Sequence, residues 1–348
     1  MKVSVHLVTW NGAKYIAPLF DSLRKQSFAD WELLIIDNNS TDDTVARVKT
    51  ELTNFLLPYR LIINHDNIGF AGGHNQAVHE TNGEYILLLN QDMYLMPDCL
   101  EKMVRFLDTH AEAAAVAPRL MRWDFVKYGE NNLMDSFSTV VDALGIKVYR
   151  NRRAVEQYTS TPWAEVRRII GNVDILEVFG ASGAFPMYRR SDIEQIYFSD
   201  GTFFDMRYHS YKEDLDVAYR LQQIGKKAYI LLDVVAYHDR SGAGPAKLSD
   251  ITAVRNKKEQ SAWIKYYSYK NHLATLYKNE YWQNFVLDAP WIAWYELKKF
   301  IYFCIFDRQI LKGLIELWQN RDDFRSKRLH IIAKRSISWH TIRKWWIK

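Results

Sequence analysis

Cysteine is scarce in this chain of 348 residues, which has only Cys99 and Cys304. Both lie in apolar segments with a helical pattern, and neither shows the spacing of a metal-ligand set. A disulfide framework is therefore not expected. Two inert thiols are typical of a protein in a reducing compartment.

The sequence also lacks a recognisable secretory leader and an uncharged apolar run. It begins MKVSVHLVTWNG, which has the pattern of a strand and a turn rather than of a signal peptide. The most apolar stretch, FVLDAPWIAWYELKKFIYFCIF, carries Asp288, Glu296, Lys298 and Lys299. No uncharged run reaches the roughly 18 residues typical of a spanning helix. We therefore expect a cytoplasmic protein.

Excess positive charge is missing from residues 1–250 and concentrated in residues 251–348. The later segment has 19 Lys and Arg against 8 Asp and Glu, a net charge of +11, which leaves −6 for the earlier one. Interleaved aromatic and basic residues on helical segments predict binding to the surface of an anionic membrane. The alternative is that these helices pack against the rest of the chain. No nucleic-acid-binding module is recognisable, so no nucleic-acid partner is expected. The tryptophans of this segment include Trp282, Trp291, Trp294, Trp318, Trp339, Trp345 and Trp346.

What is present in the first 120 residues is an alternation of strand and helix patterns. The apolar runs VSVHLV, WELLIID, RLIIN, YILLLN and AAAVAPRL are separated by amphipathic segments. This order predicts a doubly wound α/β fold with a mostly parallel sheet. We expect one domain over 1–249, with halves of about 1–120 and 121–249, and a helical, basic and aromatic extension over 250–348.

Polar clusters follow the predicted strands at Thr9-Trp10-Asn11, Asp37 to Ser40, Asn64 to Gly73 and Asn90-Gln91-Asp92. They should converge on one edge of the sheet, where ligands bind in such folds. Between about Met121 and Val178 the periodicity weakens. The stretches YGENNLMDSFS and RNRRAVEQYTSTPW have the pattern of loops, and the basic run 151–153 in the second could contact a phosphate.

Two of these clusters have open interpretations. Asp37 can accept hydrogen bonds from a base or ribose, or it can cap the next helix, although Ser40 and Thr41 are better placed for capping. The segment NIGFAGGHNQA has three glycines before a helix, which would let backbone amides approach an anion. A simple turn is an equal alternative, because the segment matches neither the Rossmann nor the Walker pattern.

Asp92 ends a buried apolar run, where a carboxylate is well suited to hold a divalent cation against a diphosphate. One carboxylate seldom holds a metal alone, and His238, after the strand VVAY, is a candidate second ligand. A lone histidine is otherwise more often structural.

The acidic residues Glu213, Asp214 and Asp216 stand at the start of a predicted helix, which runs to about Ile224 and ends at Gly225. The helix dipole alone would favour anions there. A carboxylate at this place could also act as a general base toward a hydroxyl nucleophile.

Taken together, these segments resemble the family 2 glycosyltransferases with the GT-A fold, and within them the rhamnosyltransferase-like group. The resemblance covers about residues 3–244. It is carried by VSVHLVTWNG, LLIIDNNSTDDT, NIGFAGGHNQA, YILLLNQDM, FGASGAFPMYRRS and YKEDLDVAYRLQQIG with VVAYH.

The resemblance implies a donor site for a nucleotide diphosphate sugar. Asn90-Gln91-Asp92 stands where the family carries its Asp-x-Asp-type metal motif, and Asn90 leaves Asp92 as the only carboxylate of the motif. His238 falls where galactofuranosyl- and rhamnosyltransferase relatives place a metal-binding histidine, so Mg²⁺ or Mn²⁺ is implied. By the same resemblance, Thr9, Asn11 and Asp37 would line the nucleoside pocket, Asn67, Gly72, Gly73 and Asn75 would lie near the ribose and diphosphate, and Gln91 would belong to the donor site.

For catalysis, the resemblance implies that Asp214 is the general base and that Glu213 orients it or contacts the acceptor. The small residues Gly180, Ala181, Ser182 and Gly183 would form the loop beside the donor sugar and the acceptor.

The implied reaction is an inverting transfer of a sugar, with rhamnose from dTDP-rhamnose favoured, to a hydroxyl of a lipid-linked or polysaccharide acceptor. The enzyme would work in polysaccharide or cell-wall synthesis at the inner face of the cell membrane, and a homo-oligomer is left open. The alternatives are a UDP-sugar donor, as in galactofuranosyl transfer, and a non-catalytic nucleotide- or carbohydrate-binding relative. A nucleotidyltransferase is disfavoured, because VTWNGAKY lacks a glycine-rich, basic phosphate signature.

Overall fold

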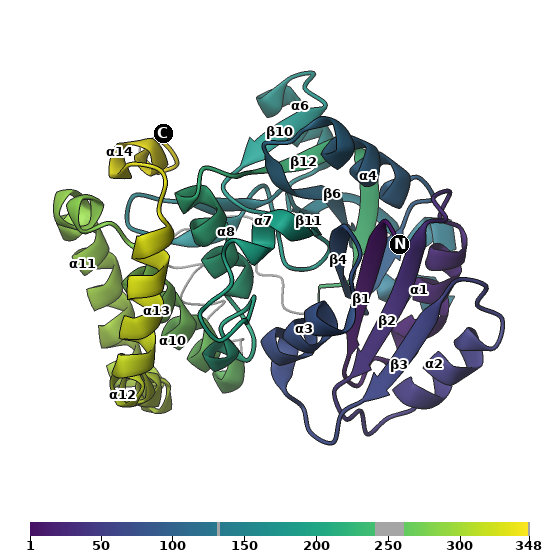
Figure 1. The fold of residues 1–348 in the computed structure, drawn as a ribbon, viewed down its shortest axis with the longest axis horizontal. Coiled ribbons are helices and arrows are strands. Elements are labelled where there is room, and N and C mark those ends of the chain that lie inside the picture. The colour runs from purple at the N-terminus through teal and green to yellow at the C-terminus, as the bar shows by residue number, and fades with distance from the viewer. Residues whose placement is uncertain (131–132, 241–260, 347–348) are drawn as a thin grey trace.

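A computed structural model describes residues 1–130, 133–240 and 261–346 of the chain. Within these residues, a mixed sheet of ten strands runs through the molecule, with the order β10-β12-β6-β11-β4-β1-β2-β3 and with β5 and β7 beside β12 and β6 (Figure 1). The strands are β1 (Val3–Thr9), β2 (Trp31–Asp37), β3 (Tyr59–Ile63), β4 (Tyr85–Asn90), β5 (Met93–Leu95), β6 (Ala113–Trp123), β7 (Phe137–Ala143), β10 (Ile175–Val178), β11 (Met187–Arg189) and β12 (Lys227–His238).

The predicted doubly wound arrangement is confirmed. The long pairings β1 with β2, β1 with β4, β2 with β3 and β6 with β12 are parallel. The antiparallel pairings of the sheet are shorter and each join two to four pairs of residues. Helices cover both faces of this sheet. They are α1 (Ala13–Arg24), α2 (Thr44–Leu52), α3 (Gly69–Glu80), α4 (Cys99–Thr109), α5 (Phe125–Glu130), α6 (Trp163–Ile170), α7 (Arg190–Glu194) and α8 (Glu213–Gln223).

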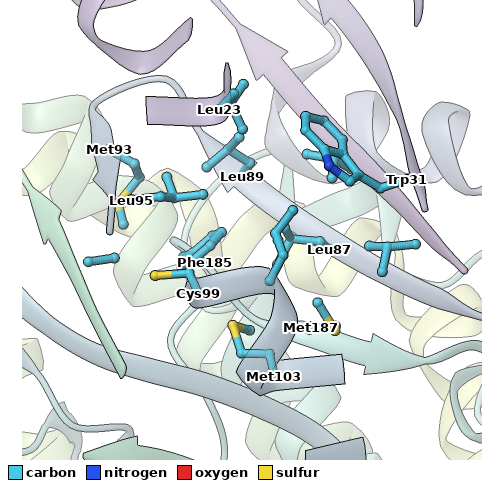
Figure 2. Close-up of a cluster of buried hydrophobic side chains, with 14 of the residues drawn as sticks. Leu23, Trp31, Leu87, Leu89, Met93, Leu95, Cys99, Met103, Phe185 and Met187 are labelled. Atoms are coloured by element: carbon cyan, nitrogen blue, oxygen red, sulfur yellow. The ribbon is translucent and has the colours of Figure 1, made fainter. Parts of the chain in front are cut away.

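Strand β4 shows why the apolar run in the sequence does not alternate. Leu87 and Leu89 pack into a cluster with α1, α2 and α4, whereas Ile86 and Leu88 pack into a second cluster with α3, α7 and α8. Figure 2 shows Leu87 and Leu89 in the first cluster, to which Cys99 also belongs. A strand covered on both faces needs apolar residues at every position.

The interruption of that run at Asn90-Gln91-Asp92 is a turn between β4 and β5. Strand β5 pairs antiparallel with the end of β12, with Met93 opposite His238. The backbone N–H of Asp239 donates to the carbonyl of Asp92 at 3.0 Å. The turn therefore brings the end of β4 beside the end of β12.

The segment from Met121 to Val178 contains more regular structure than its weak periodicity indicated, and the loops expected over 128–138 and 150–163 include parts of α5 and β7 and one short strand. Besides β7, α6 and β10, it contains a hairpin of β8 (Ile146–Val148) and β9 (Ala154–Glu156). Arg152, in the run proposed to contact a phosphate, is buried and donates to Glu280 at 2.7 Å. These short strands are stabilised by their neighbours, not by a strong pattern of their own.

The C-terminal part of the chain is helical, as predicted, and gathers at the side of the molecule away from β1, β2 and β3 (Figure 1). The predicted boundary at residue 249 lies outside the described residues. Among those described, no helix combines the length and apolar character required to cross a membrane. The helices are α10 (Ala262–Asn279), α11 (Trp282–Phe306), α12 (Lys312–Gln319), α13 (Arg321–Lys334) and α14 (Trp339–Arg343).

Buried ion pairs join these helices to the α/β body. Lys278 of α10 lies 2.6 Å from a carboxylate oxygen of Asp205 and 3.0 Å from one of Asp216 on α8. Lys327 of α13 reaches the other oxygen of Asp205 at 2.7 Å. Because charges taken out of water need close partners, separation of the extension from the body would leave these buried carboxylates without their cations.

Candidate active site

A cavity of about 490 Å³ opens where the turn after β4, the start of α8 and the end of β12 meet. Its wall also includes the loop at Ser182 and Gly183 and the first turns of α10. Carboxylates are numerous here: Asp92, Glu156, Glu213 and Asp214 all line the cavity, together with His238 and Arg240.

His238 lies between two carboxylates. Its Nε2 is 3.3 Å from Oδ1 of Asp92, and its Nδ1 donates to Oδ2 of Asp142 at 2.8 Å. Burial alone would lower the pKa of His238, but the charges and hydrogen bonds of Asp92 and Asp142 raise it to about 9. The two carboxylates thus stabilise a positive charge on the His238 ring.

Asp142, Glu156 and Arg240 belong to the same cluster, and sequence reasoning missed all three. Arg240 lies 3.6 Å from Asp142 and 3.6 Å from Glu156. Burial raises the pKa of Glu156, and the neighbouring carboxylates add to this, whereas Arg240 opposes it. Asp142 is on β7, in the range of weak periodicity, and Glu156 is on β9, in a stretch predicted as a loop. Arg240 follows His238 by two residues and could have been noticed as a cation at a strand end.

Asp214 is in the first turn of α8 and faces the small-residue loop. Its Oδ2 accepts from the N–H of Gly183 at 3.2 Å, and its Oδ1 accepts from the N–H of Leu215 at 2.7 Å. Gly180 has a packing role, because a Cβ there would lie 2.3 Å from Cβ of Ala218. Ala181 is buried, whereas Ser182 and Gly183 line the cavity.

Glu213 differs from its neighbour, because it is buried and its Oε1 has no hydrogen-bond partner. Burial, reinforced by Asp214 and Asp216, raises its pKa to about 8. The Glu213 carboxyl is therefore mainly neutral at pH 7. A neutral carboxyl is a poor proton acceptor, which disfavours Glu213 as a general base.

The predicted nucleoside residues form a separate loop cluster that does not line this cavity. Asp37 accepts from the hydroxyl of Thr9 at 2.8 Å and from the N–H and hydroxyl of Ser40 at 2.8 and 2.6 Å. Asn11 accepts from the N–H of Thr41 at 2.8 Å. These contacts fix the loops that follow β1 and β2.

The expectation that Ser40 or Thr41 caps α2 is wrong. The helix begins at Thr44, and the N–H of Thr44 donates to Oδ1 of Asp42 at 3.0 Å. The Ser40 hydroxyl is used by Asp37 instead. Asp37 therefore stabilises the turn that precedes the helix.

The remaining predicted donor residues have contacts that shape the backbone. Asn67 accepts from the N–H of Gly69 at 2.9 Å, and Asn75 accepts from the N–H of Phe204 at 2.8 Å. The Gln91 amide accepts from the N–H of Trp10 and donates to its carbonyl, both at 3.0 Å. Gly72 and Gly73 allow close packing: a Cβ would lie 2.9 Å from Ile68 at the first and 2.8 Å from Val8 at the second.

Comparison with known proteins identifies the family. The family model described as "Glycosyl transferase family 2" matches residues 4–197, which is more than half of the chain. The chain belongs to glycosyl transferase family 2. The match covers β1 to α7 and includes the turn that carries Asp92.

Curated glycosyltransferases match about a third of this chain. The putative glycosyltransferase EpsE of Bacillus subtilis is 31% identical over 123 residues, which are 35% of this chain and 44% of EpsE. The poly(ribitol-phosphate) beta-N-acetylglucosaminyltransferase TarS of Staphylococcus aureus is 33% identical over 113 residues, which are 32% of this chain and 19% of TarS. The chain thus spans less than half the length of these curated relatives.

A solved structure supports the fold assignment. GalNAc-T7, crystallised with UDP, GalNAc and Mn²⁺, superposes with a TM-score of 0.59 and 12% identity, over 80% of this chain and 48% of that one. At this identity the likeness concerns the fold alone. The predicted GT-A-type sheet with a C-terminal helical region is confirmed.

Proposed function

We propose that this family 2 protein is an inverting, divalent-cation-dependent glycosyltransferase that uses a nucleotide diphosphate sugar. The observation that carries the proposal is the cavity itself: Asp214 and the Asp92–His238 pair line the same space. A base for the acceptor hydroxyl and ligands for the donor's metal are thus available in one site.

The Asp92–His238 pair fits a divalent cation. Two donor atoms 3.3 Å apart suit neighbouring positions around one metal ion, and the Asp142 carboxylate holds the ring so that Nε2 faces Asp92. In the described part of the chain, no three His, Cys, Asp or Glu side chains converge as a complete metal site. The donor diphosphate would supply further oxygen ligands, as is usual for Mg²⁺. A bound Mg²⁺ or Mn²⁺ would offset negative charge on the leaving diphosphate.

Asp214 would act as the general base. Its carboxylate takes the proton of the acceptor hydroxyl while that oxygen forms a bond to the anomeric carbon. The bond from this carbon to the diphosphate breaks, and the nucleoside diphosphate leaves with the electron pair. A single displacement of this kind inverts the anomeric configuration. Glu213, buried and neutral, would position Asp214 or the acceptor.

The loops after β1 and β2 would bind the nucleoside. Asp37, whose two oxygens accept from Thr9 and from the N–H and hydroxyl of Ser40, would hold these loops in place around the nucleoside. Trp10, beside Asn11, is 52% exposed and offers a ring for stacking. The side chains of Gln91, Asn67 and Asn75 would support this site through the backbone contacts that they make.

For the donor, we keep dTDP-rhamnose as the first candidate and a UDP-sugar, such as UDP-galactofuranose, as the alternative. GalNAc-T7, which shares the fold of this chain, was crystallised with UDP, and this supports keeping a UDP-sugar as the alternative. Nucleotide release should be measured with dTDP-rhamnose, UDP-galactofuranose and UDP-GlcNAc, each with Mn²⁺ and with EDTA. Release that requires Mn²⁺ supports the proposal. Nucleotide binding without any release, to water or to an acceptor, would favour a non-catalytic relative.

The acceptor would be a lipid-linked or polysaccharide glycan at an anionic membrane surface. Helix α11 supports this location, because its inward residues Asp288 and Phe303 are buried while its outer face is apolar and exposed. Tryptophans on such a face, in a segment of net charge +11, suit the headgroup layer. The exposed apolar residues of α11 are Trp282, Phe285, Val286, Leu287, Trp291, Trp294, Leu297, Phe300, Ile301, Ile305 and Phe306.

A further inference from the structure

Two exposed aromatic rings line the same cavity as Asp214. Trp263, in the first turn of α10, is 46% exposed, and Tyr211, just before α8, is 39% exposed. Their ring centroids are 5.6 Å apart, with an angle of 71° between the planes. We call this pair the aromatic platform.

The platform has a firm base. The Trp263 ring packs against Tyr267 at a centroid distance of 4.9 Å and against His209 at 5.9 Å. His209 and Tyr267 are themselves stacked, with centroids 5.3 Å apart. One side of the Trp263 ring system is thus supported, while the residue stays 46% exposed and forms part of the cavity wall.

The backbone that presents Tyr211 is strained. His209, Tyr211 and Lys212 have positive φ values of 58°, 72° and 73°. Residues other than glycine seldom adopt such a backbone conformation. Each such residue costs of order 1 kcal/mol or more, and strain of this kind persists where the surrounding structure enforces it. Tyr211 is therefore held in its exposed position at the expense of stability.

Asn271 of α10 enforces this conformation. The residue is fully buried, and its Nδ2 lies 2.9 Å from the carbonyl oxygens of Tyr208 and Ser210 and 2.8 Å from that of Tyr211. Because one buried amide group contacts three carbonyl oxygens of the same loop, it restricts the backbone conformation of that loop. The C-terminal extension thus supplies both Trp263 and the residue that holds Tyr211.

We propose that the aromatic platform is an acceptor subsite that packs against the apolar face of a sugar ring and presents a hydroxyl of that sugar to Asp214. This inference rests on the proposed glycosyl transfer and deepens it. Aromatic faces beside a few polar groups are typical of sites for ligands with one apolar and one polar side. The polar groups here are Ser210, Lys212 and Ser268, which line the cavity with the platform.

A nucleobase is the other ligand that would stack on such rings. The loop residues Thr9, Asn11 and Asp37 do not line this cavity, whereas the proposed base Asp214 does. The platform therefore lies with the reacting hydroxyl and not with the nucleoside loops. Helix α10, which is part of the extension, would consequently help to select the acceptor sugar.

The direct test is binding of simple sugars without donor. Saturation-transfer NMR should be recorded with the methyl glycosides of glucose, galactose, N-acetylglucosamine and rhamnose. We expect transfer to the ring C–H protons of at least one glycoside in the full chain. Trp263→Ala should weaken that binding about tenfold or more, and Trp263→Phe and Tyr211→Phe should keep most of it, because an aromatic face remains.

Trp282→Ala is the matched control, because Trp282 is 67% exposed on α11 and does not line the cavity. Two results would overturn the inference: no glycoside binds the wild-type chain, or Trp263→Ala binds as the wild type does. UDP and dTDP titrations of the same samples test the donor site separately. A failure of the acceptor subsite is thereby distinguished from a failure of the proposed function.

Discussion

His238 and Asp92 are distant in the sequence, yet Nε2 of the first lies 3.3 Å from Oδ1 of the second. The contact follows from the short strand β5, which turns back after Asp92 and pairs with the end of β12. The proposed chemistry depends on this turn, because it places a carboxylate beside an oriented imidazole at the cavity wall.

Replacement of the general base should abolish turnover while sparing the fold. For Asp214→Asn we expect kcat to fall by about 10² to 10⁴, the usual range for loss of general acid–base catalysis. The donor KM should change little, because Asp214 contacts Gly183 and not the nucleoside loops. Steady-state nucleotide release would measure both constants. Asp30→Asn is the control, since Asp30 is exposed and precedes β2 at the opposite edge of the sheet; equal kcat for the two variants would contradict the role of Asp214.

Glu213 should make folding stability depend on pH. Its pKa is raised from 4.5 to about 8 in the folded chain, so the folded state keeps a proton that the unfolded state has lost. Its contribution is fully present below pH 4.5 and is lost as pH rises to about 8, with a slope of about 1.4 kcal/mol per pH unit. Urea denaturation between pH 5 and 9 should show that Glu213→Gln lacks this decline. A parallel decline in both proteins would disprove the assignment.

The buried ion pairs should make the extension essential for folding. Lys278→Met leaves Asp205 and Asp216 with one cation fewer, and we expect a loss of about 3 to 5 kcal/mol in the free energy of unfolding. Lys312→Met, at an exposed position of the same extension, should stay within about 0.5 kcal/mol of the wild type. Urea titration of both variants gives the comparison. A small effect at Lys278 would mean that the extension is only loosely joined to the body.

Membrane docking is best tested on α11 by surface substitutions. Removal of the extension would leave Asp205 and Asp216 without Lys278, so a shortened chain is a poor probe. Trp294→Glu with Ile305→Glu should instead reduce sedimentation with phosphatidylglycerol vesicles about tenfold, because both side chains are over 60% exposed on the apolar face. Leu56→Glu is the control, since Leu56 is 97% exposed on the α/β body. Unchanged sedimentation of the α11 variant would exclude this face as the docking surface.

The sequence was sufficient for the sheet and for the ends of its long strands. Apolar runs buried on both faces, such as YILLLN, are unambiguous, and the polar residues that follow them mark the edge where Asp92 and Asp214 lie. The helix from Glu213 to its end before Gly225, which has φ 77°, was also predictable from its capping pattern.

Asp142 and Glu156 were not predictable as site residues, because their approach to His238 and Arg240 is set by tertiary contacts, and Glu156 also lies on a very short strand. Strand β9 has three residues, and its partner β8 also has three, which is too short for a periodic pattern. Likewise, the contacts of Asn75 and Gln91 with distant backbone are fixed only in the folded chain. The sequence therefore predicted donor contacts for both residues, whereas their side chains contact the backbone.

The proposed chemistry requires that Asp92 and His238 hold the donor through a divalent cation. Calorimetric titration of the full chain with UDP and with dTDP, each with Mn²⁺ and with EDTA, tests it most directly, alongside Asp92→Asn and Asp30→Asn. We predict that one nucleotide binds in the presence of Mn²⁺, that EDTA or Asp92→Asn weakens this binding by about tenfold to a hundredfold, and that Asp30→Asn has no effect. Binding that is equally tight with EDTA and in Asp92→Asn would contradict the claim.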